Sequence, residues 1–218
     1  MIKFIEKRMR AVMAENQIKQ AKNNIDRQKT YNQQLGRYTK AMRYGFYFEA
    51  MLIAYSMLED RLKSFLYYCG FFDNRNTLKI SKKIKADIKV LLFDENPAKW
   101  PSLNNISTKI AYINALLIWA NTVQGETIQD NAIYCNLKST LESVDIGAML
   151  VSMDSLTEWI KYRNEIMHAS MNKNVDSLYE NLNVKVADGM EIARFIDSQV
   201  KLLKKNGTIR KYLKMQMN

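Results

Sequence analysis

Helical spacing is clearest in the sequence Met51-Leu-Ile-Ala-Tyr-Ser-Met-Leu-Glu-Asp-Arg-Leu-Lys-Ser-Phe-Leu66. The apolar positions that would share one face of a helix recur at intervals of four and three residues: Met51, Tyr55, Leu58, Leu62 and Phe65. The same pattern begins at Tyr38, and Gly70 is well placed to end a helix. The sequence therefore predicts a long core helix between Tyr38 and Gly70.

Helix-breaking residues are scarce in the rest of the chain. Its 218 residues include only 7 glycines and 2 prolines, and both prolines, Pro97 and Pro101, lie in one short segment. This length suffices for one domain with a sizeable core, and no linker or internal repeat divides it. We expect an all-α fold, with an extra N-terminal helix and short peripheral helices around the core.

Further helices are predicted on both sides of the proline segment. Before it, isoleucine and leucine recur at helical spacing and predict a third helix: Ile80, Ile84, Ile88 and Leu91. After it, residues 106–121 predict a fourth, which Asn104 or Asn105 can cap.

Three capping-box patterns, each a good N-cap followed three residues later by an acid, predict the later helix starts: Ser139-x-x-Glu142, Ser155-x-x-Glu158 and Asp188-x-x-Glu191. The last of these helices is expected to run to about Asn206 and to stop at Gly207. A brief alternation between Leu182 and Val186 would also allow a short strand.

Positive charge is concentrated at the two ends of the chain. Of the total formal charge of +11, residues 1–45 carry +8, residues 201–218 carry +6, and the middle carries −3. We therefore divide the chain into a basic N-terminal helix or arm (1–35), a helical bundle (36–206) and a basic C-terminal tail (207–218). Basic ends of this kind suit a polyanion, most plausibly nucleic acid, although a lysine-rich solvated surface explains them equally well.

Several classes of protein lack support in the sequence. Cys69 and Cys135 have no metal-ligand or redox spacing, so we expect no disulfide framework, no zinc site and a reducing, cytoplasmic location. The start of the chain has no signal-peptide character, and the most apolar run, residues 110–120, is shorter than the ~20 residues of a membrane span. Nucleotide-binding and hydrolase motifs are missing, so we expect no cofactor and no membrane partner; a carboxylate-only metal site stays open.

One short motif breaks an apolar stripe. Leu156, Ile160, Met167 and Met171 predict the packing face of a late helix, yet positions 163 and 164 within it are polar. The full motif is Arg163-Asn164-Glu165-Ile166-Met167-His168, and His168 is the chain's one histidine. Asn164 and His168 are i and i+4 neighbours, whereas Arg163 starts about 140° from His168 and needs its long stem to approach it.

Arginine, amide and imidazole together suit RNA cleavage by attack of the 2′-OH. The reaction needs a general base, a general acid and positive charge on the pentacovalent phosphorus, and no metal. Imidazole, with a usual pKa near 6.5, serves as base or acid; arginine binds phosphate oxygens; an amide orients the imidazole or the substrate. With one histidine per chain, a two-fold dimer would bring both motifs to one groove.

The R-N-x-x-x-H pattern on a late helix of an all-α bundle resembles the HEPN domain family. The resemblance implies a HEPN-like helical bundle of four to five core helices over residues 36–206, and dimerisation that sets two motifs side by side. It also implies metal-independent endoribonuclease activity of the kind found among toxins and phage-defence factors. It implies Arg163, Asn164 and His168 as catalytic residues, RNA as substrate, and an antitoxin or regulator as a further partner. Residues 54–66 resemble an early HEPN helix, in which Glu59 is the candidate to support the arginine.

Blander explanations stay open for each feature. Glu59 could form an ordinary i, i+4 ion pair with Lys63, and a lone histidine on a helix is often structural. The chain could instead be a non-catalytic HEPN module that binds nucleotide, RNA or a partner protein. A third possibility is a helical adaptor whose basic ends contact nucleic acid or an acidic protein.

Overall fold

The computed structural model describes residues 24–75, 78–92, 103–124, 128–169 and 179–215. The chain divides into two compact units, Met1–Arg37 and Tyr38–Asn218. Within the described residues, the regular structure is helical, and the sole extended pairing is an isolated bridge between Phe72 and Ile80. The predicted all-α class is confirmed.

Helix α2 (Asn24–Arg43) begins in the first unit and ends in the second. Its first-unit residues are polar and mostly exposed, and their side chains bond within the helix: Gln28 Nε2 donates to Asn32 Oδ1 at 3.2 Å, and the Thr30 hydroxyl donates to the Asp26 carbonyl at 2.9 Å. Residues 1–23 of the predicted basic arm lie outside the described residues.

The long helix predicted from Tyr38 to Gly70 is divided in two. Helix α2 ends at Arg43 and α3 (Tyr47–Tyr68) begins four residues later. Gly45 adopts a φ of +75°, in the left-handed region that glycine tolerates, and the Phe46 amide turns back to the Ala41 carbonyl at 2.8 Å. The predicted stop at Gly70 is confirmed, because Gly70 also has a left-handed φ of +88°.

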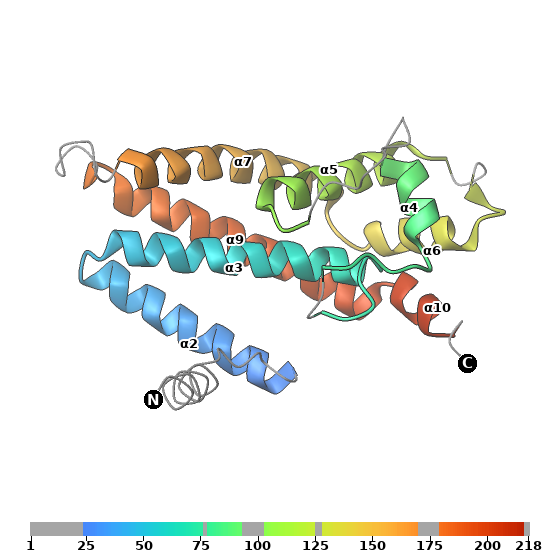
Figure 1. Ribbon diagram of the computed structural model, residues 1–218, viewed down its shortest axis with the longest axis horizontal. Coiled ribbons are helices and arrows are strands. Elements are labelled where there is room, and N and C mark those ends of the chain that lie inside the picture. Colours follow the sequence, from blue (N-terminus) through green and yellow to red (C-terminus); the bar gives the residue numbers. More distant parts are fainter. Residues whose placement is uncertain (1–23, 76–77, 93–102, 125–127, 170–178, 216–218) are drawn as a thin grey trace, which may run out of the picture. The chain divides into compact units, whose positions relative to one another are not determined.

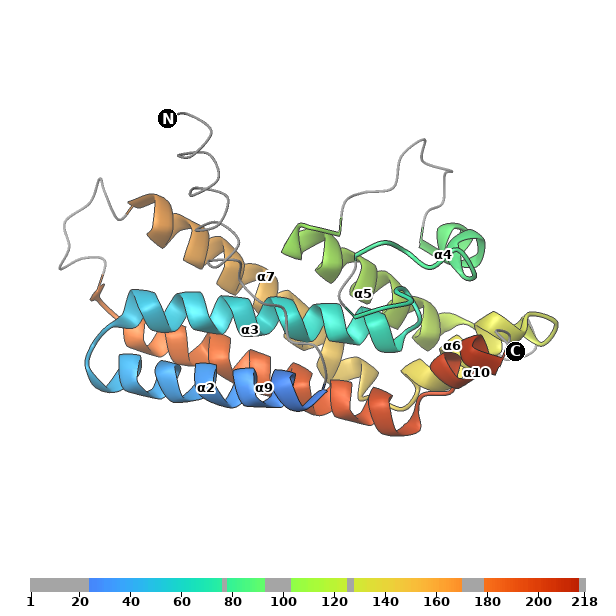
Figure 2. The same cartoon turned by 60° about the horizontal axis from the view of Figure 1, so that its bottom comes forward.

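Four long helices of the second unit make its core. These are α3, α5 (Ile106–Thr122), α7 (Ile146–Ala169) and α9 (Leu182–Asn206). Helix α3 packs along α9 and against α5, and α7 packs against both α5 and α9 (Figures 1 and 2). Fully buried apolar side chains fill the space between them, among them Leu58, Leu62, Phe65, Ile113, Leu116, Met153, Leu156 and Ile196.

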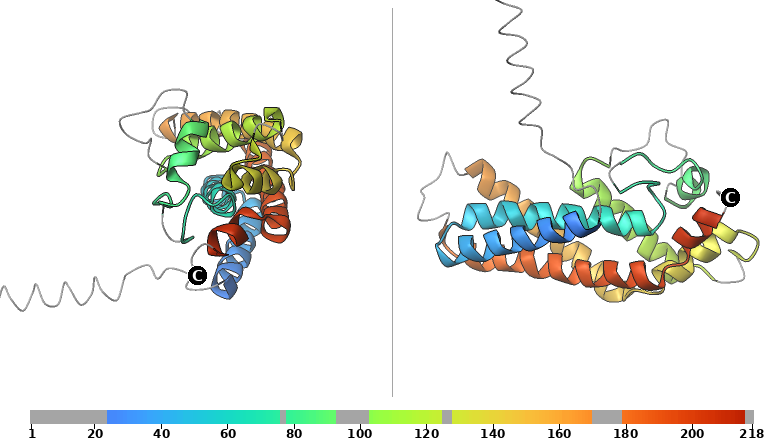
Figure 3. Two further views of the ribbon diagram at one scale, coloured as in Figure 1. Left: turned by 90° about the vertical axis from the view of Figure 1, so that its right-hand side faces the viewer. Right: turned by 90° about the horizontal axis from the view of Figure 1, so that it is seen from below.

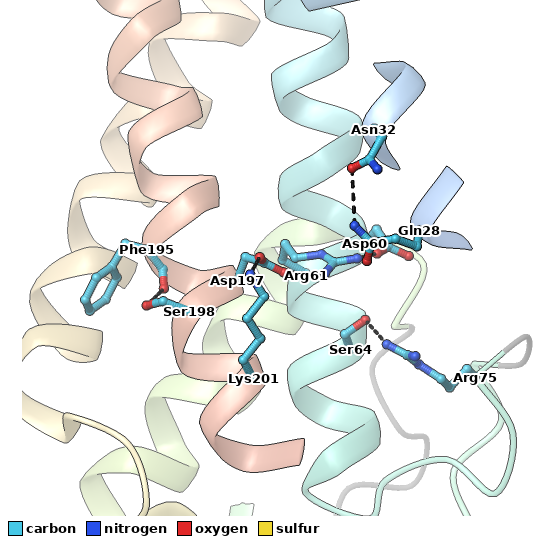
Figure 4. Close-up of polar contacts among 10 residues, drawn as sticks. All are labelled: Gln28, Asn32, Asp60, Arg61, Ser64, Arg75, Phe195, Asp197, Ser198 and Lys201. Atoms are coloured by element: carbon cyan, nitrogen blue, oxygen red, sulfur yellow. Dashed lines mark hydrogen bonds and ion pairs between the residues drawn. The ribbon is translucent and has the colours of Figure 1, made fainter. Parts of the chain in front are cut away.

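A charged network joins α3 to α9 (Figure 4). Arg61 of α3 donates to Asp197 of α9 at 2.5 Å and also pairs with Asp60 of its own helix. Asp197 accepts a second bond from Lys201 at 2.8 Å. Only 11% of the Asp197 side chain is exposed, so these partners replace the water that the carboxylate loses on folding.

The third predicted helix is shorter than its apolar pattern. Helix α4 (Lys85–Leu92) begins at Lys85 rather than Ile80. Ile80 pairs with Phe72 in the isolated bridge, and the Ser81 amide donates to the Phe71 carbonyl at 2.7 Å, which holds this backbone extended. The fourth helix is confirmed as α5, with the Asn105 side chain accepting from the Ser107 amide at 2.8 Å.

The three predicted capping boxes do not start helices. Ser139, Ser155 and Asp188 lie inside α6 (Ala132–Leu141), α7 and α9. Helix α6 is capped by Asn131, which accepts from the Ile133 and Tyr134 amides, and α9 follows Asn181 in a left-handed conformation. The alternative of a strand over residues 182–186 is also wrong, because α9 begins there. The predicted end of α9 at Asn206, followed by Gly207, is confirmed.

The predicted basic tail contains a further helix, α10 (Ile209–Met215), which packs against α6 (Figure 3). Its Ile209 and Leu213 side chains are buried. The Thr140 hydroxyl of α6, itself inaccessible to solvent, accepts from the backbone amides of Thr208 and Ile209 at 2.9 and 3.0 Å. The first free amides of α10 are thereby satisfied, which anchors the helix.

Membrane-spanning character is missing from the described helices: none combines the length and the apolar content that crossing a bilayer requires. The apolar run at residues 110–120 belongs to α5, whose Ile110, Ile113 and Leu116 are buried in the core.

Candidate functional site

The motif arginine occupies a core-facing position of α7. Buried side chains of this helix recur at intervals of four and three residues: Met149, Met153, Leu156 and Ile160. Arg163 is the next position in that series, and its side chain is half-buried. The sequence prediction that the arginine interrupts a packing face therefore agrees with the structure.

Arg163 contacts helix α3 at the ring of Tyr55. The centre of its guanidinium lies 4.5 Å from the centroid of the Tyr55 ring, within the range of a cation–π contact. Nη1 donates to the Asn164 side-chain oxygen at 3.1 Å. Nε is buried and has no hydrogen-bond partner among the described residues. The guanidinium is thus held in place with part of its donor capacity unused.

Tyr55 links the arginine to Glu59. Burial raises the pKa of the Tyr55 hydroxyl above its usual value of 10.0; the negative charge of Glu59 raises that pKa further, and the positive charge of Arg163 lowers it. Tyr55, Glu59 and Arg163 therefore share one electrostatic environment between α3 and α7.

Glu59 is paired, but not with Arg163. Its Oε1 accepts from Lys109 Nζ of α5 at 2.8 Å, an ion pair between helices that the sequence did not predict. The Lys109 side chain is 1% exposed and that of Glu59 is 41% exposed. A buried ammonium group needs a partner, and Glu59 supplies it while keeping one edge in water. Among the described residues Glu59 forms no hydrogen bond with Arg163, and the charges of both side chains act on the Tyr55 hydroxyl.

Sequence reasoning missed Tyr55 and Lys109. A signal for Lys109 was present, because it lies three residues after Ile106 and four before Ile113, on the apolar stripe of α5. A lone charge at such a position requires a buried partner. Tyr55 carried no comparable signal, since aromatic residues at helical spacing are usual in a core.

Asn164 and His168 lie on the solvent side of α7, and both side chains are exposed. They are one turn apart, as their spacing predicts. His168 forms no hydrogen bond with any residue that the structure describes, whereas Arg163 bonds to Asn164. Within one chain, the structure thus shows a hydrogen bond between Arg163 and Asn164 and none that includes His168 among the described residues. Residues 170–178, which follow the motif, lie outside the described residues.

A groove of about 420 Å³ lies on another side of α7, against the beginning of α9. Trp159, Tyr162, Lys185 and Glu191 are among its lining residues, and no motif residue lines it. Trp159 Nε1 donates to the Lys185 carbonyl at 2.6 Å, and its indole lies where a Cβ on Gly189 would approach to 2.3 Å. These contacts fix the motif end of α7 beside the first turns of α9.

Metal ligands do not gather in the described part of the chain, which holds no group of three or more His, Cys, Asp or Glu side chains placed to share an ion. Comparisons of the chain with protein-family models, with curated proteins and with solved structures found no match.

Proposed function

We propose that this protein is a metal-independent endoribonuclease of the HEPN type. The observation that carries the proposal is the surface presented by the last turns of α7. There Asn164 and His168 face solvent one turn apart, and the Arg163 guanidinium is bonded to Asn164. A base or acid, an amide and a fixed cation are the groups that phosphodiester cleavage by an internal hydroxyl requires.

The reaction follows from these groups. The ribose 2′-oxygen attacks phosphorus while a base takes its proton, and the bond from phosphorus to the 5′-oxygen breaks as an acid protonates that oxygen. The products are a 2′,3′-cyclic phosphate and a free 5′-hydroxyl. His168 serves as base or acid, Arg163 stabilises the negative charge on the phosphoryl oxygens, and Asn164 orients the imidazole or the substrate.

A homodimer completes the site in this proposal. Each chain has one histidine, so a second imidazole, for the opposite proton transfer, comes from a second copy of α7 across a two-fold axis. The exposed positions of Asn164 and His168 are compatible with such an arrangement. Single-stranded or loop RNA is the proposed substrate, and a toxin or phage-defence role with an antitoxin or regulator is the biological setting that the HEPN resemblance suggests.

The test is cleavage of RNA in excess chelator. His168→Ala should lower the cleavage rate by roughly 10²-fold or more, the usual contribution of a general acid or base. Arg163→Ala should also lower it strongly, whereas Lys161→Ala and Glu165→Gln should not; these controls change charge on exposed positions of the same helix. Intact RNA with the wild-type protein, or cleavage that persists in His168→Ala, would contradict the proposal.

A non-catalytic module is the second candidate, and a specific observation favours it. Arg163 contacts Tyr55 of α3, as a structural residue would, and no described residue orients His168. Such a module would bind nucleotide, RNA or a partner protein without turnover. Light scattering, which measures dimerisation, and the cleavage assay together separate the two candidates. The module predicts RNA binding without cleavage and weaker dimerisation of Arg163→Ala. The nuclease predicts that His168→Ala loses cleavage and still forms dimers of normal size.

A further inference from the structure

We infer that a basic surface at the C-terminal end of α3 and α9 binds the phosphate backbone of single-stranded nucleic acid. This surface, the basic end, consists of Arg75, Lys82, Lys83, Arg210, Lys211 and Lys214. The inference does not depend on the proposed cleavage. The motif lies near the beginning of α9 and the basic end lies beyond its last turn, and a helix of 25 residues is about 37 Å long (Figure 1).

Direct contacts bring these residues together from segments far apart in the sequence. Lys83 Nζ donates to the Leu213 carbonyl of α10 at 3.0 Å, across 130 residues. The approach of α10 to the end of α3 is close, because a Cβ on Gly70 would lie 2.9 Å from Leu213 Cδ1. The lysines before α4 and those of α10 therefore lie beside one another on a packed framework.

Two guanidinium groups meet at one aromatic ring of this surface. The Arg210 guanidinium lies 4.0 Å from the centroid of Tyr67 and donates to the Tyr67 hydroxyl at 2.8 Å. The Arg75 guanidinium lies 5.4 Å from the same centroid and donates to Ser64 of α3 at 2.9 Å (Figure 4). Both arginines are oriented by the fold, and the two like charges lie near each other, where an anion lowers their repulsion.

Acidic residues are few in the segments that form this surface. Residues 201–215 contain none. In residues 71–92 the described acids are Asp73, whose backbone carbonyl contacts Arg210, and Asp87, which accepts from Asn131 at 3.0 Å. Counting charges along the sequence places Lys82 and Lys83 in a middle segment of net charge −3. The count therefore did not predict this cluster, which forms because α10 packs beside these lysines.

The spacing of charge favours nucleic acid over a compact anion. Lys82, Lys211 and Lys214 are exposed, and Arg75, Lys83 and Arg210 are held by the contacts above. Cations contributed by several segments can contact successive phosphates of a chain, and binding of this kind releases counterions and depends steeply on salt. Tyr68, whose partly exposed ring has its centroid 5.2 Å from the Arg75 guanidinium, provides an aromatic ring of the type that stacks on unpaired bases.

The experiment measures binding of a fluorescent 2′-O-methyl oligouridylate to the full-length protein by anisotropy, over a series of salt concentrations. The 2′-O-methyl probe lacks the attacking hydroxyl, so the result does not depend on whether His168 cleaves RNA. The test variant is Lys82→Ala with Lys211→Ala and Lys214→Ala, three exposed lysines that form no hydrogen bond or ion pair with the described residues. The control is Lys161→Ala with Lys185→Ala and Arg194→Ala, which removes the same charge from α7 and the other part of α9.

We expect the test variant to bind at least tenfold more weakly near 0.1 M salt, and its salt-dependence slope to fall by about 2, since each lost phosphate contact accounts for roughly 0.7 on a single strand. The control should lose less than threefold. If both variants lost the same affinity for the oligouridylate, the effect would come from the net charge of the protein and not from this surface, which would overturn the inference. So would an absence of wild-type binding, or binding only to an acidic peptide or to anionic vesicles.

Discussion

Helix α3 carries two opposite charges two residues apart, Glu59 and Arg61, and each forms an ion pair with a different neighbouring helix. Arg61 joins α3 to α9 through Asp197, and Asp197 also bonds to Lys201. Glu59 joins α3 to α5 through Lys109, beside a half-buried Arg163 whose described hydrogen bond is to the neighbouring Asn164. The first face buries a carboxylate that two cations share, whereas the second buries a lysine whose carboxylate partner stays 41% exposed.

The largest expected effect lies on the α9 face. Asp197→Ala removes the shared acceptor of two cations and leaves the Arg61 guanidinium without its partner on α9, so we expect a loss of roughly 3–5 kcal/mol in the free energy of unfolding. Urea denaturation followed by circular dichroism measures it. Lys201→Ala is the matched control: its side chain is 74% exposed, and it should cost less than about 1 kcal/mol. Similar losses in the two variants would remove the distinction between buried and exposed partners.

The α5 face should respond asymmetrically. Glu59→Ala leaves the Lys109 ammonium buried and unpaired, which we expect to cost about 2–3 kcal/mol. Lys109→Met removes that charge and keeps the apolar stem, so its effect should stay within about 1 kcal/mol in either direction. Thermal and urea denaturation of both variants measure the change in the free energy of unfolding. A larger loss in Lys109→Met than in Glu59→Ala would contradict the prediction, because it would mean that Glu59 depends on Lys109 rather than the reverse.

Arg163 should matter less for stability than Arg61. Arg163→Met keeps an unbranched side chain on the packing face and loses a cation–π contact, which is worth about 0.5–1 kcal/mol at a partly exposed site. Chemical denaturation should therefore find a small change, while RNA cleavage or binding at the motif is lost. A stability loss as large as that of Asp197→Ala would place Arg163 in the framework of the fold, as in the non-catalytic alternative.

The smallest effect concerns the titration of Tyr55. Its folded pKa lies above the usual 10.0, so the folded state holds this proton more tightly than the unfolded chain does. The stabilisation is fully present below pH 10 and is lost as the pH rises through the folded pKa. Nuclear magnetic resonance of labelled tyrosine rings, assigned with Tyr55→Phe, should find this pKa lowered in Glu59→Gln and raised in Arg163→Met. No change in either variant would mean that the three side chains do not share one environment.

The helices were predictable to the extent that they bury one apolar face. Periodicity located α5 and α3, although not the break between α2 and α3. Asn105, Gly70 and Gly207 were identified from local chemistry alone. The capping boxes failed because Ser-x-x-Glu and Asp-x-x-Glu also occur on exposed faces inside helices, where Ser155 simply donates to the carbonyl of Val151. Local patterns of this kind do not record whether the preceding residues are already helical.

The candidate site was predictable only on one helix. The place of Arg163 on the packing face of α7 follows from spacing, and so does the pairing of Asn164 with His168 along one side. The contacts with Tyr55 and the bond between Glu59 and Lys109 depend on which helices pack together, which periodicity does not specify. The same holds for the basic end, where Lys83 and α10 are separated by more than a hundred residues of sequence.

The anchoring of α10 changes what a C-terminal deletion would mean. Cutting the chain after Gly207 would take away the amides that satisfy the buried Thr140 hydroxyl and the Leu213 side chain that lies against Gly70. It would also uncover Ile84, which is 1% exposed and borders the same space. The shortened chain would thus lose side chains that cover part of its core as well as the positive charges of α10. A deletion would therefore lower stability and net charge together, and its effect on binding could not be assigned to charge alone.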